Sequence, residues 1–186
     1  MRRIKKLLFL FLAIAIFVVG SSITAFANEN DVCSVDGDGY TDFATAIEEA
    51  ATGETVTLEK SFTVDTMSDI QIVDKEITLD LAGYTLTSTV DASNYHFITV
   101  GNGGSLIVKD SSPEETGCLK IAPATGGNGF GIHLLSGSSF TMQSGTIDVT
   151  RTAVDISTSA TDITVDIRGG TIRSAQYVMI VRGSNN

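Results

Sequence analysis

The sequence GIHLLSGSSFTMQSGTIDV at residues 131–149 is followed by AVDISTSATDITVDIRGGTI at 153–172, and the two stretches share one pattern. Each begins with apolar residues that alternate with polar ones, turns through small residues into a second alternating segment, and ends with a short segment after a glycine. Two further copies lie upstream, HFITVGNGGSLIVKD at 96–110 and, more loosely, ITLDLAGYTLTST at 77–89. Alternation with a period of two predicts β-strands, so we expect a repeating unit of short strands.

Apolar residues at equivalent places in the copies define the predicted core. In the first strand of the unit they are Ile98 and Val100, Ile132 and Leu134, Val154 and Ile156, and Val178 and Ile180. In the second strand they are Leu106 and Val108, Phe140 and Met142, and Val165 and Ile167. Units that recur at intervals of about 20–50 residues are typical of solenoids, in which each unit buries its apolar face against its neighbours. A sandwich of antiparallel hairpins is the alternative, but hairpins do not predict a three-strand unit that recurs in the same order. The sequence therefore predicts an all-β fold, a parallel β-helix.

One segment, YTDFATAIEEAATGETVTL at 40–58, has helical periodicity. Thr41 or Asp42 can cap its start, and Gly53 can end it. The residues that share its apolar face are Phe43, Ile47, Ala50 and Ala51. We therefore expect a short helix that caps the N-terminal end of the strands, after an acidic lead-in at 28–39 and within a β-helix domain at 40–186.

The capping helix, the Gly-Thr-Ile strands and the repeated three-strand unit together resemble the right-handed β-helix proteins of the pectin-lyase-like superfamily. The resemblance covers most of residues 38–182 and is nearest to the repeat regions of bacterial cell-surface and adhesin-like proteins. It implies a right-handed parallel β-helix, a solenoid with a short N-terminal capping helix. It does not imply one activity, because the superfamily contains lyases, hydrolases, tailspikes and non-catalytic adhesins.

Residues 1–27 have the organisation of a secretory signal peptide. The basic residues at its start are Arg2, Arg3, Lys5 and Lys6. An uncharged apolar run at 7–19 follows, and the segment ends in Ala-Phe-Ala at 25–27, a small-x-small cleavage pattern. The apolar run is shorter than the roughly 20 residues that span a bilayer, which favours a cleaved signal over an uncleaved anchor. We therefore expect a secreted or cell-surface protein that uses the general secretory route.

The chain is acidic, with 12 basic and 22 acidic residues and a formal net charge of −10. Cleavage after residue 27 would remove four basic residues and no acidic ones, and would leave the rest of the chain more acidic. Such a surface repels nucleic acid and anionic lipid, so neither is an expected partner. It also disfavours a polyanionic substrate such as pectate unless a basic cleft or bound Ca²⁺ intervenes. The two cysteines, Cys33 and Cys118, do not make a disulfide framework.

His133 and Asp155 form the first candidate catalytic pair. Equivalent residues of successive units would lie about 4.8 Å apart, so both side chains fall in one outward column. A carboxylate at that distance can orient an imidazole for general acid–base catalysis. The alternative is an exposed polar pair on a solvated sheet face, and no serine or cysteine is placed beside the pair as a nucleophile.

Asp166 and Arg168 are the second candidate pair. The alignment places Asp80 level with Asp166 and Ala82 level with Arg168. Glycoside hydrolysis requires two carboxylates around the sugar, which this pair does not supply. The Asn-Thr-Asp, Asp-Asp, His-Gly and Arg-Ile-Lys signature of the pectin hydrolases is also absent as a set. A solvated charged face is therefore the favoured interpretation.

The segment VDGDGYTDF at 35–43 is a candidate metal site, because Asp36, Asp38 and Asp42 occupy positions one, three and seven of an EF-hand loop. Thr41 stands where that loop requires glycine, and Ile47 stands where it requires glutamate. An acidic turn that leads into a helix cap is the favoured interpretation. We expect no metal and no other cofactor.

The longer interval between Ile98 and Ile132 contains two insertions, at 110–117 and 122–129. Loops that project from a rigid scaffold commonly carry binding surfaces, although neutral variation in loop length is the alternative. The candidate binding residues in the two insertions are Asp110, Pro113, Glu114, Glu115, Pro123 and Asn128.

The last residues, YVMIVRGSNN at 177–186, align with the first strand of a unit, and no second strand follows. This predicts a β-helix domain that is truncated at its C-terminal end and self-associates through the exposed edge.

The expected function is a non-catalytic, extracellular β-helix segment of a bacterial surface protein that binds a glycan, matrix or host partner. Two alternatives stay open. One is a carbohydrate-active enzyme of the same fold, a polysaccharide lyase or glycoside hydrolase, and the other is a purely structural spacer.

Overall fold

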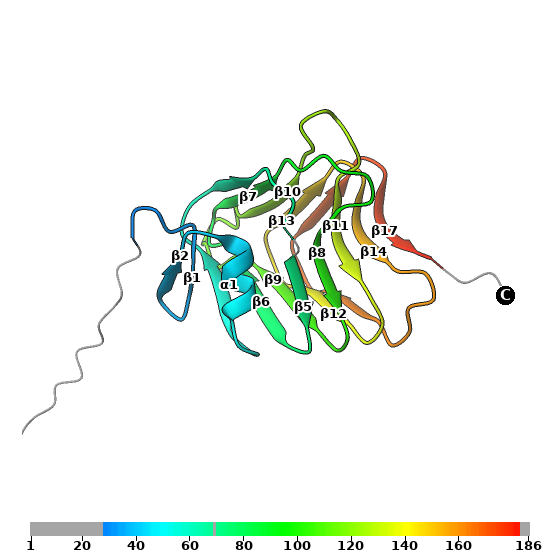
Figure 1. Ribbon diagram of the computed structural model, residues 1–186, viewed down its shortest axis with the longest axis horizontal. Helices are drawn as coiled ribbons and strands as arrows, with labels where there is room; N and C mark the ends of the chain where they lie inside the picture. The colour runs from blue at the N-terminus through cyan, green and yellow to red at the C-terminus, as the bar shows by residue number, and fades with distance from the viewer. Residues whose placement is uncertain (1–27, 69, 183–186) are drawn as a thin grey trace, which may run out of the picture.

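The computed structural model describes residues 28–68 and 70–182, so the expected signal peptide lies outside the described part of the chain. The described residues form a mostly β structure with one short helix, and three sheets surround the core (Figure 1). We call the three sheets A, B and C. Consecutive strands from β3 (Thr55–Leu58) onward go to sheets A, B and C in turn, and this order then repeats along the chain. No helix in the described ranges is long and apolar enough to cross a membrane.

Every strand pair of the described residues is parallel except those that involve β1 (Cys33–Val35). Sheet A contains, in spatial order, β15 (Thr164–Ile167), β12 (Ser139–Met142), β9 (Ser105–Lys109), β6 (Glu76–Asp80), β3 (Thr55–Leu58), β1 (Cys33–Val35) and β2 (Asp38–Tyr40). Sheet B contains β16 (Thr171–Ser174), β13 (Thr146–Val149), β10 (Cys118–Ile121), β7 (Thr85–Ser88) and β4 (Phe62–Val64). Sheet C contains β17 (Tyr177–Val181), β14 (Thr152–Ile156), β11 (Phe130–Leu134), β8 (His96–Gly101) and β5 (Ile70–Val73).

Columns of apolar side chains in register form the core. One column in sheet A contains Val56, Leu79, Val108, Met142 and Ile167. The first four are fully buried, whereas Ile167 at the end of the column is 47% exposed. In parallel strands with period-two alternation, each inward side chain packs on its equivalents in the neighbouring strands. The predicted register of the second and third strands of the unit is confirmed, as in the pairs Phe140–Val165 and Leu119–Ile147.

The predicted register was wrong at two places, each for a recognisable reason. Met179, not Val178, pairs with Val154, so the last strand is displaced by one residue. All five residues of β17 are apolar or aromatic, so no alternation fixes which of them point inward. Asp80 pairs with Lys109 rather than lying level with Asp166. The run ITLDL has three alternating apolar residues, and a slip of two positions preserves its inward pattern.

The N-terminal end of the sheets is covered by structure of its own. Helix α1 (Phe43–Glu49) begins after Asp42, whose side chain accepts a hydrogen bond of 2.8 Å from the amide of Thr45. The helix buries Phe43, Ala46 and Ile47. Within the lead-in, β1 and β2 form an antiparallel hairpin that pairs with β3, an extension of sheet A that the sequence analysis did not predict.

Candidate functional site

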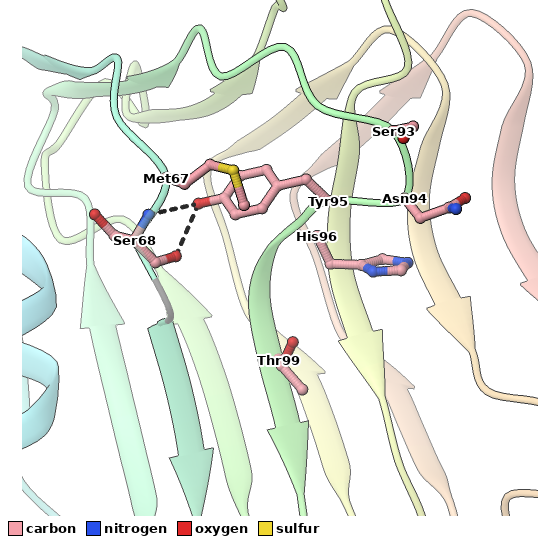
Figure 2. Close-up of a pocket in the computed structure, with 7 residues that line it drawn as sticks. All are labelled: Met67, Ser68, Ser93, Asn94, Tyr95, His96 and Thr99. Atoms are coloured by element: carbon pink, nitrogen blue, oxygen red, sulfur yellow. Dashed lines mark hydrogen bonds between the residues drawn. The ribbon is translucent and has the colours of Figure 1, made fainter.

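The connections from sheet B to sheet C gather on one corner of the molecule, and a pocket of about 450 Å³ opens there. Its lining residues are Met67, Ser68, Ser93, Asn94, Tyr95, His96 and Thr99 (Figure 2). Tyr95 joins two of the connecting loops, because its hydroxyl donates to the Ser68 carbonyl at 2.9 Å and accepts from the Ser68 amide at 3.4 Å. The wall of the pocket is thus fixed by hydrogen bonds between loops.

A departure from strand alternation at the start of β8 brings His96 to the outer face. Phe97 and Ile98 are consecutive, and both belong to the buried core. Strict alternation would place His96 on the inner side with Ile98. Instead, the His96 ring stacks on that of His133 on the outer face, with centroids 4.0 Å apart and an interplanar angle of 13°.

Four residues form what we call the histidine cluster: His96, His133, Asp155 and Arg182. The Nε2 atom of His96 lies 2.9 Å from Oδ2 of Asp155. Arg182 donates from Nε to Oδ1 of Asp155 at 2.8 Å and from Nη2 to Oδ2 at 3.0 Å. Asp155 is only 2% exposed, so its charge is buried but well compensated.

The surroundings of the cluster shift the pKa of two of its groups, the Asp155 carboxyl and the His133 imidazole. Burial acts to raise the pKa of the Asp155 carboxyl, but hydrogen bonds and positive charge from Arg182 and His96 outweigh it, and that pKa is lowered. Burial lowers the pKa of His133, and the neighbouring His96 lowers it further.

An aromatic ring supports the cluster from one side. Phe130 lies in register with His96, and the two ring centroids are 4.8 Å apart. The guanidinium of Arg151 lies over the Phe130 ring at 4.6 Å, a cation–π contact. These contacts limit how far the His96 ring can move toward the neighbouring strand.

The predicted pair His133 and Asp155 is in register as expected, but its description as an exposed pair on a solvated face was wrong. Asp155 is buried and hydrogen-bonds to His96 and Arg182, which the sequence analysis did not identify. The assumption of regular alternation in this strand had placed His96 on the inner side. One sequence signal could have drawn attention to His96, since the chain has only two histidines. In the structure these two rings stack on each other.

Asp166 and Arg168 lie apart from the histidine cluster, on β15 and just after it. They form an ion pair of 2.7 Å between exposed side chains. Ion pairs of this kind contribute little to stability, so the arrangement fits the solvated face that the sequence favoured.

Asp110 has a structural role that its assignment as a binding residue overlooked. It is buried, and its carboxylate accepts hydrogen bonds from the amides of Gly83 (2.8 Å), Ser112 (3.0 Å) and Gly117. Burial acts to raise the pKa of this carboxyl, but these hydrogen bonds outweigh it and lower that pKa. Asp110 therefore holds the insertion at 110–117 in place.

The other candidate residues of the insertions divide by exposure. Pro123 is buried, whereas the exposed ones are Pro113, Glu114, Glu115 and Asn128. The EF-hand candidates lie at the hairpin and the helix cap: Asp36 has a positive φ of 50° in the turn between β1 and β2, and Asp42 caps α1. Within residues 28–68 and 70–182, the group of side chains placed to hold a metal ion is His96, His133 and Asp155.

The sequence matches no family model, and it matches no curated protein and no solved structure.

Proposed function

We propose that the chain is an exported, right-handed parallel β-helix module that binds an extracellular glycan and catalyses no reaction. The repeated passage of the chain through sheets A, B and C supports the β-helix. Right-handedness is supported by the strong general preference for right-handed connections between parallel strands. Export is supported by the signal-like organisation of residues 1–27.

The pocket at the B–C corner is the observation that supports glycan binding. Its volume of about 450 Å³ falls within the range of roughly 300–1,000 Å³ that is typical of ligand sites. Hydroxyl groups, an amide and an imidazole line it beside the ring of Tyr95. Such a mixture can exchange hydrogen bonds with sugar hydroxyls while the ring offers an apolar surface.

A carbohydrate-active enzyme is the second candidate, and the contact between His96 and Asp155 favours it. A buried carboxylate that holds an imidazole at the edge of a pocket is the arrangement of a general base and its orienting group. The chain would then act on a glycan that lies in the same pocket. Glycan-binding and catalytic roles therefore differ in what happens to the ligand, not in its place.

Purified residues 28–186 should be tested on a glycan array and, in parallel, for cleavage of a panel of polysaccharides. Our proposal predicts binding without cleavage. Thr99→Val removes a hydroxyl from the pocket and should weaken binding. Thr141→Val makes the same change at an equally half-buried position on sheet A and should not. Cleavage that His96→Ala abolishes would instead establish the enzyme, and a folded chain that binds no glycan would favour a structural spacer.

A further inference from the structure

We infer that the histidine cluster is a binding site for a divalent transition-metal ion, with Zn²⁺ as its representative, held by His96, His133 and Asp155. This inference does not depend on glycan binding. Each of the three residues offers one ligand atom, and these atoms lie within 4.8 Å of one another. Two imidazole nitrogens and one carboxylate oxygen form a ligand set found in zinc sites that keep a fourth position open.

The ligand atoms of the three side chains have to shift from their present separations to those of a zinc site. Zinc–nitrogen and zinc–oxygen bonds of about 2.0–2.2 Å in tetrahedral geometry separate the ligand atoms by about 3.3 Å. The His96 and Asp155 atoms are already 2.9 Å apart. The ligand strands β8, β11 and β14 are adjacent and in register, so the backbone already holds the three side chains together.

The two stacked rings must separate when the ion binds. Their planes are almost parallel, whereas the lone pair of an imidazole nitrogen lies in the plane of its own ring. One ring therefore has to turn about its Cβ–Cγ bond, a torsion that is soft in histidine. His133 is the ring that can turn, because His96 is held by its contact with Asp155 and by the ring of Phe130.

Arg182 occupies the position of a counter-cation in the metal-free protein. Its guanidinium contacts both carboxylate oxygens of Asp155, but its own side chain is 43% exposed and can move toward solvent. If Oδ2 binds the ion, the contact from Nε to Oδ1 can persist and orient the carboxylate, as the outer partners of metal ligands commonly do. The positive charge of Arg182 nevertheless opposes the ion.

The ligand chemistry selects the class of ion. Ca²⁺ and Mg²⁺ prefer sites made entirely of oxygen ligands, whereas imidazole suits zinc, copper and nickel. The acidic chain attracts cations in general, so Ca²⁺ is the necessary comparison.

Residues 28–186, purified without any polyhistidine tag, should be titrated with ZnCl₂ by calorimetry and followed by NMR of the histidine rings. We expect one Zn²⁺ per chain, and the ring signals of the two histidines should shift together. CaCl₂ at the same concentration should do neither. Since the chain has two histidines, both signals can be assigned from the variants alone.

Substitution of a single ligand should weaken zinc binding by at least about tenfold. His133→Ala is the best first variant, because Asp155→Asn also breaks the contacts with Arg182 and could disturb folding. Asp166→Asn is the matched control, since this carboxylate also pairs with an arginine but has no histidine beside it, and it should leave binding unchanged.

A wild-type chain that binds no Zn²⁺ at millimolar concentration would overturn the inference. Binding that His96→Ala and His133→Ala both leave intact would overturn it as well. None of these results bears on the glycan proposal, which Thr99→Val tests separately.

Discussion

The two ends of the sheets have similar sequences but different surroundings. At the N-terminal end, β1 extends sheet A beyond β3, and α1 packs beside β5 (Figure 1). The Phe43 ring stacks on that of Phe97, with centroids 6.3 Å apart. At the opposite end, β15, β16 and β17 are the outermost strands of the three sheets within residues 28–68 and 70–182. The large apolar residues exposed on these strands are Ile167, Tyr177, Val178, Met179 and Val181.

The difference shows that burial in such a stack depends on neighbours on both sides. Val56 and Ile167 stand at opposite ends of the same column, yet Val56 is fully buried and Ile167 is about half exposed. The side chains are similar, so the covering structure accounts for the contrast. Substitutions in the middle and at the two ends of the sheets should therefore differ in cost.

The largest effect is expected for Ile147→Asp in the middle of sheet B. Ile147 is fully buried between Leu119 and Ile172, and an unpaired buried carboxylate costs several kcal/mol, comparable to the whole stability of a domain. Circular dichroism should show an unfolded or very low-melting chain.

Two matched variants sharpen this test. Thr146→Asp places the same carboxylate on the outward neighbour and should melt close to the wild type. Ile172→Asp, in the same column but on the outermost strand, should be intermediate because Ile172 is only partly buried. Equal melting temperatures for all three would show that the inward and outward assignment is wrong.

Truncation of apolar residues at the two ends should give the second-largest contrast. Leu58→Ala on β3 should cost about 2–5 kcal/mol, because Leu58 is buried under β1 and the substitution leaves a cavity. Ile167→Ala on β15 should cost less than about 1 kcal/mol, since half of the side chain is already in water. Urea denaturation measures both, and equal costs would contradict the proposed role of β1 as a cover.

Two carboxylates extend the comparison to electrostatics. Asp110→Asn, near the middle, should cost about 1–3 kcal/mol at pH 7, because three amides lose a charged acceptor. Asp166→Asn on the outermost strand should stay within about 0.5 kcal/mol, since its ion pair is exposed.

The pH dependence provides a check on Asp110. Its carboxyl has a lower pKa in the folded chain than in the unfolded chain, where it is about 3.9. The stabilisation is therefore fully present above about pH 4 and is lost as the pH falls through the folded pKa. The melting temperatures of wild type and Asp110→Asn should converge in acid, and a constant difference between them would contradict this origin.

The accuracy of the prediction from sequence depends on how regularly polar and apolar residues alternate. Where polar and apolar residues alternate strictly, as in SFTMQ, the mostly β class, the strand positions and the core columns were all predicted. Where alternation fails, the prediction failed as well. In YVMIV, no alternation indicated which residues pair with the neighbouring strand. Before the consecutive core residues Phe97 and Ile98, alternation did not indicate that His96 points outward.

The candidate site depends on contacts that no local pattern contains. Asp155 and Arg182 are in contact because β17 lies beside β14. The sequence predicted this strand pair, but its predicted register was wrong by one residue. The hydrogen bonds by which Asp110 holds the 110–117 insertion likewise join residues of different strands and loops.

The smallest effect on stability, but a clear effect on the particle mass in solution, is expected from lysine on the strands β15 and β17. The outer edges of β15, β16 and β17 present backbone amides and carbonyls together with apolar side chains, which favours pairing with another chain. We expect residues 28–186 to self-associate with increasing concentration, as light scattering would show.

The corrected register places Met179 rather than Val178 in line with the core, so Ile167→Lys with Met179→Lys should restore a monomer. The double variant should change stability little, because both side chains are substantially exposed. Met67→Lys removes an apolar residue that is even more exposed but lies away from these strands, and it should leave the association unchanged. If Met67→Lys disrupts it and the double variant does not, the chains meet at the B–C corner and not at the strand edges.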